Sequence, residues 1–325
     1  MLNPERAAHV AQLELLRRAA LSVVDGPDAP VSDPAAWQHP SGEFIGWRLT
    51  WPTDEGLSAW VQANMHLACT ALLSCADQIA GLLLLAAGDP SPMLAVGSVC
   101  RSTVEAAGQA WWLREPLLAP ALDDEVWPAL GARACAVAAS WYGWSAKLSR
   151  DFVAGDGTAR APLDPELKRL LAVGEEEARE SAKAAQANLA GKEGRGVTFR
   201  YTAAAVALLD VARLPRGLAT YARLCEASHA NPLAITRSDP TPELMRFGLM
   251  PLDRSPSSSA VRDDETVDTF LLEVVRCVHA ALVEGFAPLA GRTWGLAYRE
   301  HRELLTSFDD WIDRTTEARP GSSAG

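Results

Sequence analysis

The sequence predicts an all-α protein, built as a single helical bundle around a central antiparallel hairpin. Ala and Leu dominate its 325 residues and β-branched residues are sparse, which favours helix over strand. No segment alternates apolar and polar residues for long enough to form a half-buried strand. The stretches 57–88 and 92–114 are almost free of charge and are joined by a short proline-containing turn. We expect these two helices to fold back on each other.

An amphipathic helix is expected at 4–24, before the hairpin. Residues 25–55 form a long loop rich in Pro, Gly, Asp and Trp, which we expect to be ordered because its tryptophans would anchor it to the body. After the hairpin, a helix is expected at 123–153. Another at 163–190 carries the most solvated charge run of the chain.

The remaining helices are expected at 200–212, 214–231, 263–289 and 298–317. Residues 239–261, rich in Pro and Ser, read as a loop. The total is eight or nine helices. No internal repeat and no clean linker divides the chain, so we predict one all-α domain over 1–318 and a disordered tail over 319–325.

The net charge of −11 argues against any extended nucleic-acid surface, because such surfaces need basic stripes. The same negative net charge is unsuited to binding an anionic membrane surface. A small local basic site remains compatible with this charge. The six cysteines lie scattered inside apolar segments without CxxC spacing, which is typical of reduced, buried thiols in a cytoplasmic protein.

No membrane association is expected, although Leu67–Gly88 is long enough to cross a bilayer. That stretch carries Asp77 and Gln78 near its middle and has no Lys or Arg flank. The N-terminal segment is an amphipathic helix and lacks the pattern of a signal peptide. The sequence has no HExxH or ExxH spacing for a metal, no GxGxxG and no P-loop. The DDxxD pattern at 309–313 lies on an amphipathic helix without the partner motif of a magnesium-diphosphate site, so we expect neither a metal nor a cofactor.

Charged residues meet at one level of the predicted hairpin. Counting outward from its turn places Asp77 at about the level of residue 103, between Arg101 and Glu105. The last two are four residues apart on one helix face, and Trp112 continues that stripe. A guanidinium beside a carboxylate and an indole can hold an anionic or planar ligand. The alternative is an internal ion pair that fixes the register of the helices.

A polar stripe runs along the first hairpin helix. Its members, at one-turn spacing, are His66, Thr70, Ser74 and Asp77. The stripe is either a solvent face on an outer helix or, because it lacks Lys and Glu, the wall of a pocket.

A second stripe falls on the helix at 214–231, where one face carries Tyr221, Cys225 and either Ser228 or His229. His229 comes just before Asn231 and Pro232, which end the helix. The helix dipole at that end favours a protonated imidazole, which suits a general acid. The alternative is a histidine in a structural, capping hydrogen bond.

The Arg-x-x-x-Glu of 101–105 and the Tyr-x-x-Leu-Cys-x-x-Ser-His of 221–229 resemble a group of bacterial helical proteins that is itself similar to the HEPN superfamily. The resemblance covers about 101–112 and 221–232. It implies a helical bundle, often dimeric, that is either a metal-independent ribonuclease or toxin with an Arg-x(4–6)-His motif or an inactive binding module. Arg223 and His229 fit that motif, with five residues between them.

The chain departs from the pattern in two respects. Leu224 replaces the polar residue that usually follows the arginine. Six residues also turn a helix through about 600°, which puts Arg223 and His229 roughly 120° apart. Arg101 could therefore serve His229 better than Arg223 does.

Three functions follow as hypotheses. The first is HEPN-like RNA cleavage in a defence or toxin role, with His229 as general acid or base and Arg101 or Arg223 stabilising phosphoryl charge. The second is a bundle that binds or transforms a small anionic ligand in a Trp-lined pocket. The third is a non-catalytic interaction module.

The candidate catalytic residues are His229, Arg101, Glu105, Tyr221 and Arg223, and the candidate ligand-binding residues are Asp77, His66, Trp112, Cys225 and Asn231. RNA or a small anion, and a second copy of the chain, are the expected partners.

Overall fold

The all-α prediction is confirmed by the computed structural model. The structure describes residues 4–25, 55–87, 93–118, 125–154, 197–212, 217–228 and 264–286, and short helical pieces between 165 and 180. Apart from residues 197–200 and single turn residues, these residues form helices, and they contain no strand. Of the loop predicted at 25–55, Asp25 and Glu55 belong to helices and residues 26–54 lie outside the described residues. The predicted loop at 239–261, the predicted helix at 298–317 and the predicted tail at 319–325 also lie outside them.

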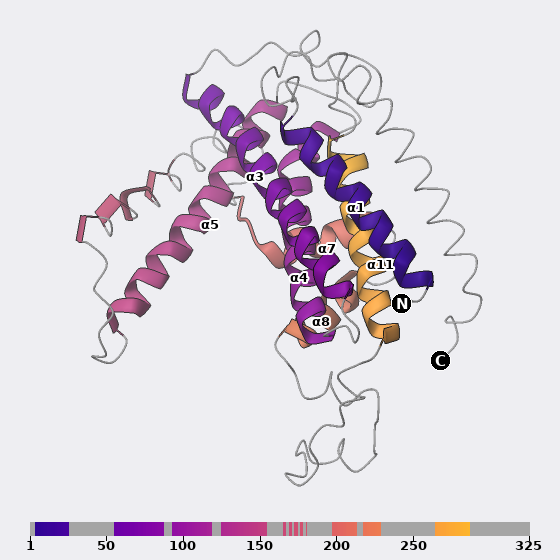
Figure 1. The fold of residues 1–325 in the computed structure, drawn as a ribbon. Coiled ribbons are helices and arrows are strands. Elements are labelled where there is room, and N and C mark those ends of the chain that lie inside the picture. The colour runs from indigo at the N-terminus through magenta and orange to yellow at the C-terminus, as the bar shows by residue number, and fades with distance from the viewer. Residues whose placement is uncertain are drawn as a thin grey trace.

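The central hairpin is formed by α3 (Glu55–Ala86) and α4 (Met93–Arg114), as the charge-poor stretches predict. Figure 1 shows α4 enclosed by other helices. It packs against α3, α7 (Tyr201–Val211), α8 (Gly217–Ser228) and α11 (Asp264–Ala280). A helix surrounded in this way must be apolar on most of its faces, which explains why α4 carries so few charges.

The other helices cover this centre on two sides. α1 (Pro4–Asp25) lies across α3 and α11, and a π-helical turn at Ala281–Phe286 continues α11. A 3-10 helix at Glu115–Leu118 follows α4. α5 (Val126–Ala154) begins against α3 and then diverges from the bundle, as Figure 1 shows. Trp141 and Trp144 on the diverging part of α5 are exposed.

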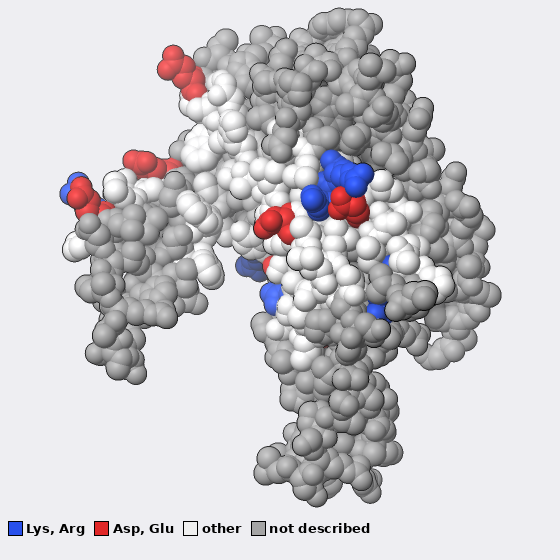
Figure 2. Space-filling model, in the orientation of Figure 1, with Lys and Arg blue, Asp and Glu red and all other residues white. Residues whose placement is uncertain are grey.

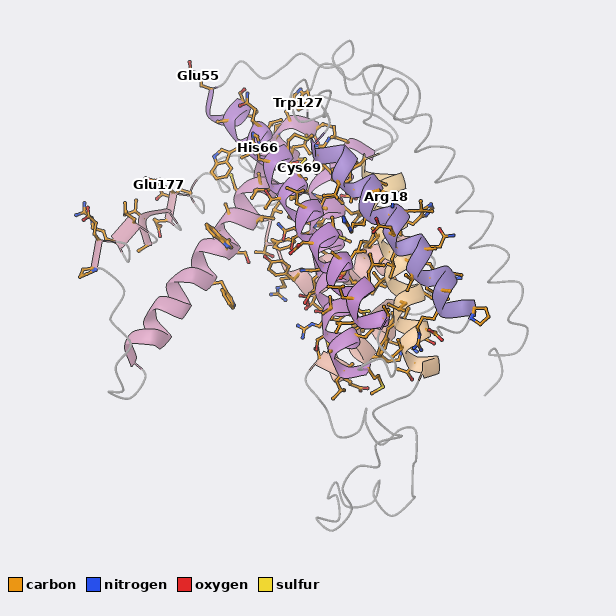
Figure 3. All side chains as sticks on the ribbon, in the orientation of Figure 1. Arg18, Glu55, His66, Cys69, Trp127 and Glu177 are labelled. Atoms are coloured by element: carbon orange, nitrogen blue, oxygen red, sulfur yellow. The ribbon has the colours of Figure 1, made fainter. Side chains whose placement is uncertain are left out.

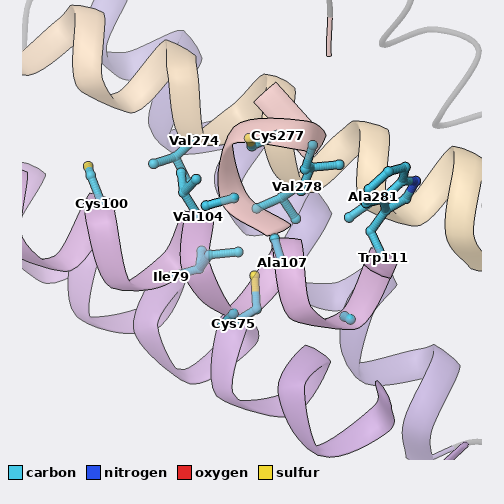
Figure 4. Packing of buried hydrophobic residues seen from close by; sticks show 14 of the residues in the cluster. Cys75, Ile79, Cys100, Val104, Ala107, Trp111, Val274, Cys277, Val278 and Ala281 are labelled. Carbon is cyan, nitrogen blue, oxygen red and sulfur yellow. The ribbon is translucent and has the colours of Figure 1, made fainter. Parts of the chain in front are cut away.

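The main core lies where α3, α4 and α11 meet. Figure 4 shows Cys75 and Ile79 of α3 facing Val104 and Ala107 of α4, with Val274 and its neighbours on α11 closing the third side. In Figure 3 the side chains crowd into the space between these helices, while the diverging part of α5 stands apart. The bundle therefore has a continuous apolar centre that fixes where polar groups can sit.

The cysteines are thiols without a disulfide partner, and five of the six are buried. Burial raises the pKa of Cys75 to about 12, so its sulfur stays protonated and unreactive at neutral pH. Cys225 on α8 is the half-buried exception.

The helix α3 passes the length and composition test for a membrane span. In the structure it packs against α1, α4 and α5. Fully buried residues such as Leu72 and Ile79 face those neighbours. A core helix of a soluble protein has the same length and composition, so α3 is weak evidence for a membrane protein.

Asn64 is a polar residue in a second, smaller core, and its contribution can be measured. Its side chain is fully buried, and Nδ2 donates to the carbonyl oxygens of Leu113 at 3.1 Å and Leu130 at 3.0 Å, which ties α3 to α4 and α5. Asn64→Leu keeps the size and adds apolar surface, yet we expect a loss of about 2 kcal/mol because both carbonyls lose a donor. Urea unfolding would measure it. Leu72→Met on the same helix is the volume-conserving control, and equal or greater stability of Asn64→Leu would contradict the expectation.

Candidate functional site

The four polar residues Arg101, Glu105, Tyr221 and Ser228 form one hydrogen-bonded group, called here the Arg101 cluster. Nε of Arg101 donates to Oε1 of Glu105 at 2.9 Å, and Nη1 of Arg101 donates to Oγ of Ser228 at 2.9 Å. The hydroxyl of Tyr221 donates to the same Oε1 of Glu105. The cluster thus joins α4 to α8, and its charged side chains remain 25% and 21% exposed.

The protonation states of the cluster follow from its contacts. Burial acts against the charge of Arg101, but the hydrogen bond and the charge of Glu105 outweigh it, so the pKa of Arg101 is raised. Burial, and then the hydrogen bond to Glu105, raise the pKa of Tyr221 to about 12. At neutral pH the cluster therefore holds a cationic guanidinium and a protonated phenol.

Two glycines of α4 let the neighbouring helices come close enough to form the cluster. A Cβ on Gly97 would lie 2.5 Å from the Cβ of Ala227 on α8. A Cβ on Gly108 would lie 2.8 Å from the backbone nitrogen of Ala205 on α7. Both distances are shorter than van der Waals contact, so the close packing of α7 and α8 on α4 depends on these positions lacking side chains.

A row of three aromatic residues, Trp112, Phe199 and Tyr201, extends from the cluster along α4 to the start of α7. The ring centroids of Trp112 and Phe199 are 5.1 Å apart, and those of Phe199 and Tyr201 are 4.8 Å apart. The guanidinium of Arg133 lies over the Trp112 ring at 4.7 Å. Next to Tyr201, the hydroxyl of Thr202 is 3.4 Å from that of Tyr221. The row therefore ends at the Arg101 cluster.

The prediction that Asp77 shares one layer of charges with Arg101 and Glu105 is wrong for Asp77. Asp77 is exposed on α3, and among the described residues no ion pair joins it to Arg101, which pairs with Glu105. Counting residues from the turn gives the height of Asp77 along the hairpin but not the direction of its side chain. Cys75, Ala76 and Ile79 face the core, so Asp77 lies on the outer side of α3.

The polar stripe of α3 is a solvent face. His66, Thr70, Ser74 and Asp77 are all exposed, which decides between the two interpretations of the stripe. The hydroxyl of Thr70 donates to the carbonyl oxygen of His66 at 2.8 Å, a local bond within the helix. His66 and Asp77 therefore do not line a site with Arg101 in this structure.

Arg223 points away from the Arg101 cluster. It lies on the other side of α8 and donates from Nη2 to Oε1 of Glu273, a buried carboxylate on α11. Of the two arginines that the sequence offers, only Arg101 is part of the cluster with Tyr221 and Ser228. This agrees with the helical geometry, which separates Arg223 from the face that Tyr221 and Ser228 share.

Two of the remaining candidate residues, Cys225 and Trp112, are described by the structure. Cys225 is half-buried on α8. Trp112 belongs to the aromatic row and does not form a wall for the guanidinium of Arg101, because its ring packs between Phe199 and Arg133. His229 and Asn231 lie outside the described residues. His229 directly follows Ser228, which Arg101 contacts.

Sequence reasoning missed Thr202, Phe199 and Tyr201 as neighbours of the cluster. No motif marks them, and their proximity to Glu105 arises only from the packing of α7 on α4. The one available signal was Gly108, a glycine inside a helix that continues the stripe of Arg101 and Glu105 and indicates a close neighbour at that face.

No protein-family model, curated protein or solved structure matches the chain. Among the residues that the structure describes, no group of three or more His, Cys, Asp or Glu side chains could hold a metal ion.

Proposed function

We propose that this chain is a HEPN-like protein that cleaves RNA without a metal ion, at a site formed by the Arg101 cluster and His229. The observation that carries the proposal is the 2.9 Å hydrogen bond from Arg101 to Ser228. It brings a guanidinium to the last described residue of α8, the residue that precedes His229 in the sequence. A cation that stabilises phosphoryl charge and a histidine that transfers protons can together carry metal-independent phosphodiester cleavage.

The roles divide as follows. His229 transfers protons, either taking the proton of the attacking ribose hydroxyl or giving one to the leaving oxygen. Arg101 stabilises the negative charge that builds on the phosphate oxygens as one P–O bond forms and the other breaks. Glu105 holds the guanidinium through Nε, and Ser228 accepts a hydrogen bond from Nη1, so the guanidinium is fixed in orientation at the end of α8. Tyr221 anchors Glu105 from α8.

The charge distribution indicates a small footprint on the RNA. On the face shown in Figure 2, the charged side chains of the described residues stand in small separate groups of both signs. Because the net charge of the chain is −11, affinity from many phosphate contacts is not expected. A short segment bound at one point fits this surface better than a long duplex.

The test compares cleavage of a mixed RNA substrate in EDTA by the wild type, His229→Ala and Arg101→Ala. We expect each variant to lose roughly 100-fold or more in rate. Arg223→Ala is the matched control. Like Arg101→Ala it removes one guanidinium, but from the side of α8 that faces Glu273. It should cleave near the wild-type rate. Melting temperatures are measured for all four proteins.

The outcomes separate the hypotheses. Absence of cleavage by the wild type would reject the ribonuclease and leave the cluster as a binding site for a small anion. Loss of activity in Arg223→Ala but not in Arg101→Ala would assign the cationic role to the motif arginine. A large fall in melting temperature for Arg101→Ala and His229→Ala, without any cleavage by the wild type, would make the cluster a structural contact of an interaction module.

A further inference from the structure

The exposed end of the aromatic row lies beside the Arg101 cluster. Tyr201 is 42% exposed, whereas Phe199 behind it is only 6% exposed. The two rings meet edge to face at 4.8 Å, with an interplanar angle of 75°. Phe199 is in turn held by Trp112. An exposed tyrosine fixed by a buried aromatic support presents its ring in a defined orientation.

Tyr201 is also close to the proposed chemistry. The charge of Glu105 acts on it, after burial, to raise the pKa of its phenol. The adjacent Thr202 approaches the hydroxyl of Tyr221, a member of the cluster. Arg200, the N-cap residue of α7, is exposed next to Tyr201 and adds a positive charge at the same edge.

We propose that Tyr201 is a stacking platform for one base of single-stranded RNA, next to the phosphate that Arg101 holds. This inference rests on the proposed function and names the form of its substrate. An aromatic ring beside a cation binds an unpaired nucleotide, because the base stacks on the ring while the phosphate meets the cation. In a duplex the bases are already stacked on each other and cannot reach the ring.

The platform explains how an acidic protein can bind RNA. Stacking is independent of the net charge of the protein, and it contributes affinity that the small basic site cannot supply. Phe199 has a structural role here, since it is buried between Trp112 and Tyr201 and positions the ring that the base would contact.

The test measures binding and cleavage of a short single-stranded RNA by the full chain and three variants at Tyr201. Tyr201→Phe keeps the ring and should bind like the wild type. Tyr201→Ala and Tyr201→Leu remove the aromatic face, and each should bind about tenfold more weakly. Tyr201→Leu keeps apolar contact with Phe199, so it decides the result if the alanine variant melts early. A matched duplex should bind weakly to every protein.

An abasic nucleotide gives a second, independent measurement. Placed next to the cleaved bond, it should weaken binding to the wild type about as much as Tyr201→Ala does, and combining the two should add little further loss. Cleavage by the wild type with no dependence on Tyr201 would overturn the platform and leave the ribonuclease standing. Binding that depends on Tyr201 without any cleavage would reject the ribonuclease and retain the platform. No binding and no cleavage would reject both.

Discussion

Gly108→Ala is expected to destabilise the protein by about 2–3 kcal/mol, although alanine forms helices better than glycine does. The added Cβ would lie 2.8 Å from the nitrogen of Ala205 and 2.9 Å from its Cα. These are backbone atoms of α7, so no side-chain rotation can relieve the contact. The whole of α7 would have to move away from α4. Thermal and urea unfolding measure the loss.

Gly81→Ala on α3 is the matched control. A Cβ at Gly81 would meet nothing within 4 Å, so the substitution gains helix propensity without a clash. We expect it to stabilise the protein by about 0.5–1 kcal/mol. The same chemical change should therefore have opposite signs in the two helices of one hairpin. Stabilisation by both variants would show that α7 does not approach α4 at Gly108 as closely as the structure places it.

Gly108→Ala also tests whether the proposed site depends on the packing of α7 against α4. Moving α7 away from α4 would carry Tyr201 and Thr202 away from Glu105 and Tyr221. RNA binding through the aromatic row should then weaken in Gly108→Ala, even at temperatures where the protein remains folded. Gly81→Ala should leave RNA binding unchanged, because Gly81 lies on α3, outside the Arg101 cluster and the aromatic row.

The sequence was sufficient to predict the fold class, the hairpin and the limits of several helices. Long runs without charge favour burial of at least one face, and a short proline-containing turn between two of them favours an antiparallel hairpin. The helix predicted at 123–153 is observed at Val126–Ala154, and the one predicted at 263–289 is observed at Asp264–Ala280 with its π-helical continuation. Periodicity and composition determine such features locally.

The site was predicted only where it depends on spacing within one helix. The pairing of Arg101 with Glu105 follows from their separation of four residues, and it is observed. The direction of Asp77 depends on which face of α3 meets the core, and a level counted along the hairpin does not contain that information. The contact of Arg101 with Ser228 and that of Arg223 with Glu273 depend on how α8 is rotated against α4 and α11.

Glu273 is a buried carboxyl whose titration should be visible in the pH dependence of stability. Its residue is 4% exposed, Arg223 binds Oε1, and among the described residues Oε2 has no hydrogen-bond partner. Burial raises its pKa to about 7, because the loss of hydration outweighs the attraction of Arg223 and Arg276. The folded state therefore keeps this proton at a pH where the unfolded chain has already lost it.

The sign of the effect follows from that difference. As the pH rises from about 4.5 to about 7, the unfolded state ionises first and gains relative to the folded state, so the free energy of unfolding falls. Between pH 5 and pH 8 this one group should cost the wild type roughly 2–3 kcal/mol. Glu273→Gln cannot ionise and should lack this part of the decline. Urea unfolding at the two pH values measures it.

Arg223→Ala removes the other partner of the Arg223–Glu273 contact and should change the pH dependence in the opposite direction from Glu273→Gln. Without the guanidinium, the pKa of Glu273 should rise further, and the loss of stability between the two pH values should become larger. Equal pH dependence in the wild type and Glu273→Gln would mean that Glu273 is not held in the buried position that the structure gives it. Because Arg223→Ala is expected to change this pH dependence while leaving RNA cleavage intact, a single variant separates the α8–α11 ion pair from the site on the other side of α8.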